Sequence, residues 1–183
     1  MISWIQGVDW KVLDGIQHTF ACGFLDALMP WITRLGNGGA IWILAAVLLL
    51  FRKKYRRNGI LLLCGLLCGV LIGNVVLKHL VARPRPCWLR PEFQLLLAVP
   101  KDFSFPSGHT LSSVIAVGCL ARTDRRLGAV AIPLAALIAF SRLYLFVHFP
   151  SDVLASVVLG AGIVWGMERL FKAIWKRLPS AEN

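Results

Sequence analysis

Long apolar runs alternate with short polar segments along most of the chain. The runs occupy residues 40–51, 59–81, 108–121, 127–147 and 153–171. About 20 apolar residues in a helix suffice to cross the hydrocarbon core of a bilayer, and an isolated helix satisfies its own backbone hydrogen bonds there. The pattern therefore predicts an all-α fold, a polytopic membrane helix bundle that forms a single domain over residues 1–183.

The N-terminal part of the chain carries a weaker pattern. Residues 1–19 mix apolar and charged positions, which is typical of a helix lying in the membrane interface. Residues 20–35 are more apolar but contain Asp26, and a carboxylate is costly in hydrocarbon. We expect residues 20–35 to form a weak first span and leave open whether they cross fully. About six transmembrane helices are then predicted, at residues 20–35, 37–51, 59–81, 108–121, 127–147 and 151–171.

Two smaller patterns refine this picture. Four prolines exclude a continuous helix from residues 82–105, which we predict to be the one substantial loop, on the extracytoplasmic side. Glycines recur at positions 65, 69 and 73, so one face of that span is smooth enough for a neighbouring helix to approach closely. The last span repeats the small-residue spacing at Gly162 and Gly166. The two glycine faces are candidates to pack together, and their pairing is left open.

Composition and charge place the protein in a membrane and orient it. Hydrophobic residues make up 57% of the chain and the mean hydropathy is +0.70, values outside the range of ordinary soluble domains. The net charge of +11 comes from basic clusters between apolar runs, which argues against a nucleic-acid partner. With six spans, thirteen of the twenty Lys and Arg residues lie on the side of the N-terminus. The positive-inside rule makes that side cytoplasmic, which predicts a multi-pass protein of the cytoplasmic (inner) membrane. If residues 20–35 lie only in the interface, the N-terminus changes side and the rest of this prediction stands.

The N-terminus and the five cysteines point to no processing signal and no cross-link. No basic segment followed by an apolar core opens the chain, so no cleavable signal peptide is expected. The cysteines have neither C-x-x-C nor Cys/His ligand spacing, so we predict no disulfide or zinc framework.

Polar residues interrupt the apolar pattern between positions 141 and 152. Asp152 follows His148 by four residues, across a Phe-Pro-Ser corner with Ser151 as a candidate N-cap. A carboxylate on one ring nitrogen raises the basicity of the other, so His148 is a candidate nucleophile or base. The alternative is that both residues only cap helices at the membrane surface. Because Pro150 disfavours helix just upstream, we predict that the preceding helix ends before His148.

Two further polar clusters fall at the same extracytoplasmic level. Ser107 is a candidate N-cap, and Gly108 lets a ligand approach the exposed N–H groups of a helix start, with His109 in its first turn. Lys78, Arg83 and Arg85 supply cations where a span meets the loop. The alternatives are an ordinary capped helix with a surface histidine, and cations that extend to lipid head groups.

Taken together, the three clusters favour metal-free phosphoryl transfer. Arginine side chains bind phosphate oxygens and neutralise charge in the transition state, a role that other enzymes give to metals. Only Glu92 and Asp102 add carboxylates on this face, and they are too few and too loosely spaced for a di-metal site. We therefore expect no metal and no cofactor.

Three segments of the sequence resemble the signature motifs of the type 2 phosphatidic acid phosphatase superfamily. They are Lys78 with Arg85-Pro86, Pro106-Ser107-Gly108-His109, and Ser141-Arg142 with His148 and Asp152. The resemblance implies that His148 attacks phosphorus and that Asp152 orients it, while His109 protonates the leaving group and then activates water. It also implies that Lys78, Arg85, Ser107, Gly108 and Arg142 bind the phosphoryl oxygens. Arg83 lies outside the pattern, and its role is left open.

The predicted position of the site also bears on the substrate. A site at the outer membrane level with an aromatic-rich loop suits a lipid phosphate of the outer leaflet. The resemblance puts undecaprenyl diphosphate first, with phosphatidylglycerophosphate and phosphatidic acid as alternatives. Vanadium haloperoxidases share the same constellation but are largely soluble. A non-catalytic transporter is disfavoured because transporters tend to place charged sites near the midplane.

Overall fold

The computed structural model describes residues 3–177, and these form helices and loops without a strand. The elements are, in chain order, α1 (Ser3–Phe20), α2 (Gly23–Leu35), η1 (Asn37–Gly39), α3 (Ala40–Leu50), η2 (Lys53–Tyr55), α4 (Arg56–Gly69), the π-helical η3 (Val70–Leu77), α5 (Lys78–Val81), α6 (Pro86–Leu89), α7 (Gly108–Thr123), α8 (Arg125–Tyr144) and α9 (Pro150–Arg177). The prediction of an all-α fold is confirmed.

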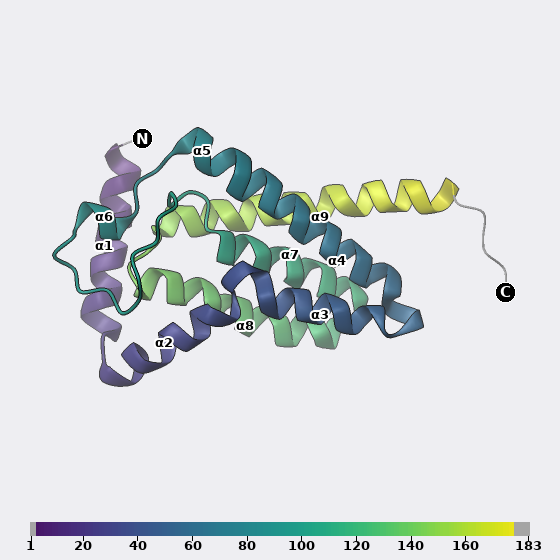
Figure 1. The fold of residues 1–183 in the computed structure, drawn as a ribbon, viewed down its shortest axis with the longest axis horizontal. Coiled ribbons are helices and arrows are strands. Elements are labelled where there is room, and N and C mark those ends of the chain that lie inside the picture. The colour runs from purple at the N-terminus through teal and green to yellow at the C-terminus, as the bar shows by residue number, and fades with distance from the viewer. Residues whose placement is uncertain (1–2, 178–183) are drawn as a thin grey trace.

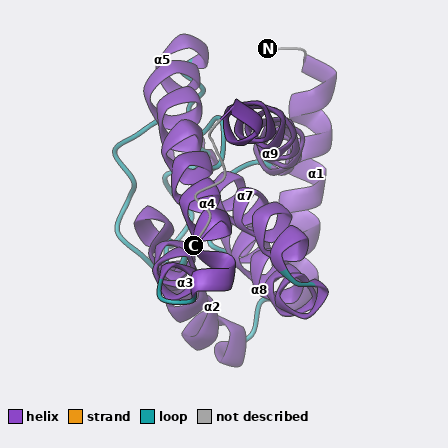
Figure 2. Ribbon diagram, turned by 90° about the vertical axis from the view of Figure 1, so that its right-hand side faces the viewer, coloured by secondary structure: helices purple, strands orange, loops and turns teal. Residues whose placement is uncertain are grey.

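Helices α3, α4, α7, α8 and α9 run along the long axis of the molecule, whereas α1 lies across one end (Figure 1). The end-on view in Figure 2 shows the same crossing. Helix α7 is central, and its Leu111 and Ile115 are fully buried in the main hydrophobic core. Large apolar side chains also point outward, with Val130 72% and Val158 74% exposed. Such an apolar exterior is what a surface in contact with lipid requires.

Three helical segments are long and apolar enough to cross a membrane, namely Lys53–Leu89, Arg125–Tyr144 and Pro150–Ile174. Residues 20–35 and 37–51, predicted as two spans, instead form a pair bent by 44° that meets the same test only together. The physical reason is length, because the 13 residues of α2 rise only about 20 Å. The bent pair counts as one broken span or as a re-entrant segment.

The position of α1 corrects the predicted side of the N-terminus. Its Asp9 contacts Ser151 at the start of α9 and Arg83 in the long loop. Helix α1 therefore lies at the same end of the bundle as the loop of residues 82–105, opposite to the basic turn at residues 52–57 (Figure 1). Lys11 moves to that end with it. The other basic clusters keep their predicted distribution.

The structure decides the partner of the glycine face at residues 65, 69 and 73, which the sequence left open. A side chain at Gly65, Gly69 or Gly73 would meet Ile115 or Leu111, so this face packs against α7. At Gly162 and Gly166, by contrast, a methyl group would have no neighbouring atom within 4 Å, so these two glycines do not take part. The smooth face lets α4 and η3 lie close to the helix that carries the Ser107–His109 cluster.

Candidate active site

A cavity of about 220 Å³ opens at the end of the bundle where α1 lies. Six of the eight predicted site residues line it, namely Lys78, Arg85, Gly108, His109, Arg142 and His148. The other two lie behind its wall, because the side chains of Ser107 and Asp152 are fully buried. The fold thus brings together residues as far apart in the sequence as Lys78 and His148.

The polypeptide between α8 and α9 presents His148. Helix α8 ends at Tyr144, which confirms the prediction that the helix stops before the histidine. Phe146 turns the chain with a left-handed φ of 57°. Helix α9 begins at Pro150, so Ser151 lies inside its first turn and is not the N-cap, contrary to the prediction. Instead, the Asp152 carboxylate accepts a hydrogen bond from the Phe149 N–H at 2.9 Å, as a residue in the third helical position can.

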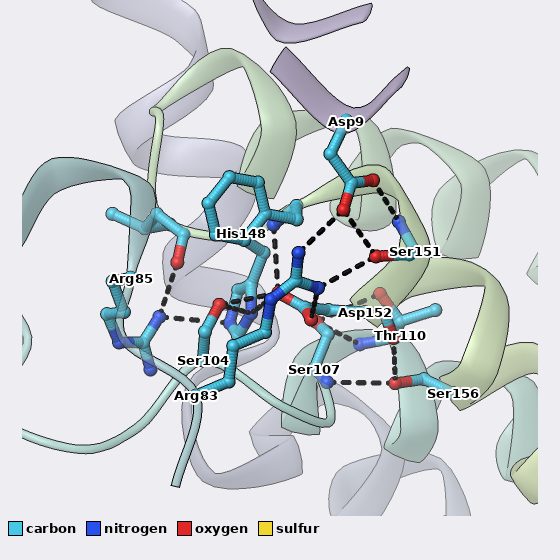
Figure 3. A network of polar contacts seen from close by, with 12 residues as sticks. Asp9, Arg83, Arg85, Ser104, Ser107, Thr110, His148, Ser151, Asp152 and Ser156 are labelled. Atoms are coloured by element: carbon cyan, nitrogen blue, oxygen red, sulfur yellow. Dashed lines mark hydrogen bonds and ion pairs between the residues drawn. The ribbon is translucent and has the colours of Figure 1, made fainter. Parts of the chain in front are cut away.

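The His148 imidazole is held between an arginine and a carboxylate (Figure 3). Its Nε2 lies 3.1 Å from Arg85 Nη1, and its Nδ1 lies 3.7 Å from Asp152 Oδ2. Because a guanidinium can only donate, Nε2 is the acceptor and the ring proton sits on Nδ1, facing Asp152. Burial lowers the pKa of His148 to about 3, an effect that Asp152 opposes and the charges of Arg85 and Arg142 reinforce. The ring is therefore neutral at pH 7, with an unprotonated Nε2 at the cavity.

Two cations of the cavity share one acidic partner. Lys78 and Arg85 both form ion pairs with Asp102, in the second case at 2.8 Å between Nη2 and Oδ1. Although burial opposes it, the hydrogen bond from Lys78 and the charge of Arg85 lower the pKa of Asp102 to about 2. Its carboxylate is consequently ionised at neutral pH. Asp102 therefore pairs with Lys78 and Arg85, the two cations that a bound phosphate would need as partners.

We expect Asp102→Asn to bind inorganic phosphate and vanadate more tightly than the wild type does. Removal of the carboxylate charge frees Lys78 and Arg85 for the anion, and because Asp102 is half-exposed the gain is limited to roughly two- to fivefold in the inhibition constant. Competitive inhibition measured at low ionic strength checks this. Glu92→Gln, a change in an exposed acid of the same loop, is the control and should leave the constant unchanged. Weaker anion binding by Asp102→Asn would contradict the prediction.

His109 faces the cavity from the first turn of α7 and is held by the turn after α2. Its Nε2 lies 3.0 Å from Asn37 Oδ1, and since an amide oxygen only accepts, Nε2 carries a proton. Ser107 caps α7 as predicted, its Oγ accepting from the N–H of Thr110. Gly36 packs directly against the imidazole, because a methyl group at this position would lie 2.7 Å from His109 Cδ2.

Gly36→Ala should therefore displace the His109 ring without unfolding the protein. The backbone of Gly36 has φ −86° and ψ −6°, which alanine adopts easily, so the clash with His109 and Ile138 is the main effect. Displacement of a catalytic group by about 1 Å can lower the rate about 100-fold, and we expect a fall in kcat approaching that size. Gly162→Ala is the matched control, since open space surrounds that position. Equal kcat values for the two variants would contradict the assignment.

Sequence reasoning missed several residues of the site. Thr33 accepts a hydrogen bond from Arg142 Nη1 at 2.5 Å, and Ser104 donates one to Asp152 at 2.5 Å. Asn74 lines the cavity one turn before Lys78, and its buried Oδ1 has no partner among the described residues. Its i, i+4 spacing to Lys78 is a signal that could have identified it. Thr33 and Ser104 carry no such local signal.

Arg83, whose role the motifs leave open, lies within the site. Its Nη1 donates to Asp152 Oδ1 at 2.5 Å and its Nη2 to Asp9 Oδ2 at 2.6 Å (Figure 3). The guanidinium stacks over the Phe149 ring at 4.0 Å and is 3% exposed. Arg83 therefore does not reach the cavity but supports the carboxylate behind His148.

Known proteins with similar sequences share this architecture. The family model of the PAP2 superfamily matches residues 59–176, which is more than half of the chain. An undecaprenyl-diphosphatase of Sulfolobus acidocaldarius is 36% identical over 76% of this chain and 67% of its own length, and phosphatidylglycerophosphatase B of Bacillus subtilis is 32% identical over 82% and 69%. The crystal structure of a transmembrane PAP2 type phosphatidylglycerolphosphate phosphatase from Bacillus subtilis superposes with a TM-score of 0.72 at 25% identity, covering 97% of this chain and 89% of the other. This chain is an integral membrane phosphatase and belongs to the PAP2 superfamily.

Proposed function

We propose that this protein removes the terminal phosphate of an isoprenoid lipid diphosphate, undecaprenyl diphosphate in the first place, through a phosphohistidine on His148. The observation that carries the proposal is the neutral His148, whose unprotonated Nε2 faces a cavity with Lys78, Arg85 and Arg142 on its walls. A nucleophile beside three cations and a second histidine whose Nε2 carries the ring proton suits attack on a phosphate.

In the first step, the Nε2 lone pair of His148 forms a bond to the terminal phosphorus. The bond between phosphorus and the bridging oxygen breaks, and that oxygen receives a proton from His109. His109 acts as an imidazolium in this step, a form that the negative charge of the bound phosphate favours, and it becomes neutral when it gives up the proton. Undecaprenyl phosphate leaves, and the phosphoryl group stays on His148. Lys78, Arg85 and Arg142 neutralise the charge of the phosphoryl oxygens, with Asp102 turned away from the first two. The N–H groups at Ser107 and Gly108 offer a further anion-binding helix start.

In the second step, water attacks the phosphohistidine and gives a proton to His109. The bond between Nε2 and phosphorus breaks, inorganic phosphate leaves, and both histidines return to their starting forms. Asp152 stabilises the positive charge that His148 carries while it is phosphorylated. No metal is required in this scheme because the cations of the cavity take over charge neutralisation.

The size and position of the cavity support a lipid substrate. At about 220 Å³ it is smaller than the 300–1,000 Å³ typical of sites that enclose a whole drug-sized ligand, so it suits a head group whose chain remains in the bilayer. The apolar outward faces of the surrounding helices offer such a chain a lipid environment. The relative from Sulfolobus is an undecaprenyl-diphosphatase. We place the site on the extracytoplasmic side of the inner membrane, since basic residues gather at the opposite end of the bundle.

The test is phosphate release by the purified protein in detergent with excess chelator. Undecaprenyl diphosphate, phosphatidylglycerophosphate and phosphatidic acid are compared, since relatives with the first two activities exist. We expect chelator-resistant release, fastest from the diphosphate. Faster release from phosphatidylglycerophosphate would reassign the substrate. Release that stops with chelator and returns with a divalent cation would refute the metal-free mechanism.

A further inference from the structure

Helix α1 contributes a buried carboxylate to the support of the catalytic histidine. Asp9 is 2% exposed, although it lies in an amphipathic helix outside the residues that match the family model. Its Oδ1 accepts a hydrogen bond from the Ser151 N–H at 2.9 Å, and its Oδ2 accepts one from the Ser151 hydroxyl at 2.6 Å. Asp9 therefore holds the first turn of α9, one residue before Asp152 (Figure 3).

Arg83 joins this carboxylate to the one behind His148. Its two terminal nitrogens divide between Asp152 and Asp9, at 2.5 Å and 2.6 Å, and both ion pairs are almost completely buried. Ser151 Oγ accepts a further hydrogen bond from Arg83 Nη1 at 2.7 Å. A planar guanidinium with fixed donors is suited to bridge two carboxylates in one geometry. The chain of contacts runs from α1 through Arg83 to Asp152 and ends at His148 Nδ1.

The charges of Asp9, Arg83 and Asp152 explain why two carboxylates share one arginine. Asp9, Arg83 and Asp152 together carry one net negative charge. If Asp9 were neutral, Arg83 would interact with Asp152 alone, and that pair would have no net charge to set against the His148 Nδ1–H. Asp9 thus leaves Asp152 negative enough to attract the Nδ1–H group of His148 and to stabilise a phosphorylated ring.

We propose that Asp9 is a positioning residue of the active site, acting through Arg83 and Ser151 on the Asp152–His148 pair. The proposal rests on the proposed function of His148 and extends the machinery to α1. Asp9 does not reach the cavity, and its removal should lower kcat while it leaves KM for the lipid nearly unchanged. We expect a fall of roughly tenfold for Asp9→Asn, the lower end of what supporting hydrogen-bond partners contribute at other sites.

The experiment measures kcat and KM of Asp9→Asn, with Asp14→Asn as the matched control. Asp14 lies in the same helix, but its ion pair with Arg90 is exposed, so its replacement should change kcat by less than about twofold. Arg83→Lys is the second variant, since lysine keeps the charge but cannot bridge two carboxylates as a guanidinium fork does. We expect Arg83→Lys to lower kcat in the same way, and Asp9→Asn to add little to it because the two residues act as one unit. A raised KM with unchanged kcat, or equal losses for Asp9→Asn and Asp14→Asn, would overturn the proposal.

A second readout does not depend on turnover. The ¹H and ¹⁵N chemical shifts of the His148 Nδ1–H group report how strongly the facing carboxylate attracts its proton. We expect both shifts to change in Asp9→Asn and in Arg83→Lys, while the proton stays on Nδ1 because Arg85 still donates to Nε2. Unchanged shifts in both variants would refute the role of Asp9. If the wild type released phosphate from no lipid, the proposed function would fail, while the NMR comparison would still decide the positioning role.

Discussion

The His148→Ala variant is expected to release no phosphate above background from any lipid, a loss of at least about 1,000-fold. The reason is that, among the described residues, no second histidine lies between an arginine of the cavity and a supporting carboxylate, so neither half of the reaction has a substitute nucleophile. Phosphate release under single-turnover conditions checks the rate. Quenching in alkaline denaturant and mass spectrometry of the wild type, without an acid step, should reveal a phosphorylated peptide that contains His148, and the variant should lack it.

Binding has to be separated from chemistry in this comparison. Because Lys78, Arg85 and Arg142 remain in place, His148→Ala should still bind inorganic phosphate with an affinity close to that of the wild type. If His148→Ala lost both activity and phosphate binding, the site would have collapsed. The loss of rate would then say nothing about whether His148 is the nucleophile. Residual activity above one hundredth of the wild-type value, with phosphate still bound, would show that His148 is not the attacking group.

The His109→Ala variant is expected to accumulate the phosphorylated enzyme. General acid–base catalysis contributes about 10²- to 10⁴-fold, and His109 is placed to serve both steps. A substrate with a good leaving group, such as p-nitrophenyl phosphate, needs little acid assistance, so that the first step survives while hydrolysis of the phosphohistidine loses its base. The measurement is a burst of p-nitrophenol followed by a slow steady state, together with a long-lived phosphopeptide.

The contrast between leaving groups is the control for this prediction. With a lipid monophosphate, whose alkoxide is a poor leaving group, His109→Ala should also slow the first step, and no burst is expected. Asn37→Ala removes the hydrogen bond that holds the His109 ring but leaves the ring in place, so a smaller effect of the same kind is expected. Equal slowing of both substrates without a phosphorylated enzyme would contradict the double role of His109.

Much of the site could be predicted from the sequence because the information is local. Runs of apolar residues define the bundle, and the spacing of Lys78 and Arg85, of Ser107 to His109, and of Arg142 to Asp152 places each group near a helix end at one level of the membrane. Six of those eight residues line one cavity. The end of α8 before His148 also followed from one local property, the restriction that Pro150 imposes upstream.

The errors arose where distant parts of the chain compete for the same space. Residues 20–35 have the composition of a weak span, but α2 is too short to cross alone and forms a bent pair with α3. Thr33 of α2 accepts a hydrogen bond from the buried guanidinium of Arg142 at the end of this helix. The partner of the glycine face of α4 and η3, which the sequence left open, is α7, because α7 occupies the centre of the bundle. No residue pattern within residues 20–51 predicts the bend, and none within residues 59–81 predicts that the glycine face packs against α7.

The sequence by itself determined that this is a helical membrane protein and which polar groups meet at one end of its bundle, since hydropathy, charge and spacing are properties of neighbouring residues. The tertiary structure alone decided which groups support them. Asp9 meets Arg83 across 74 positions of sequence, and Gly36 and Asn37 hold the ring of His109. Such contacts depend on how helices close around buried charges, which must be paired wherever a partner can reach them.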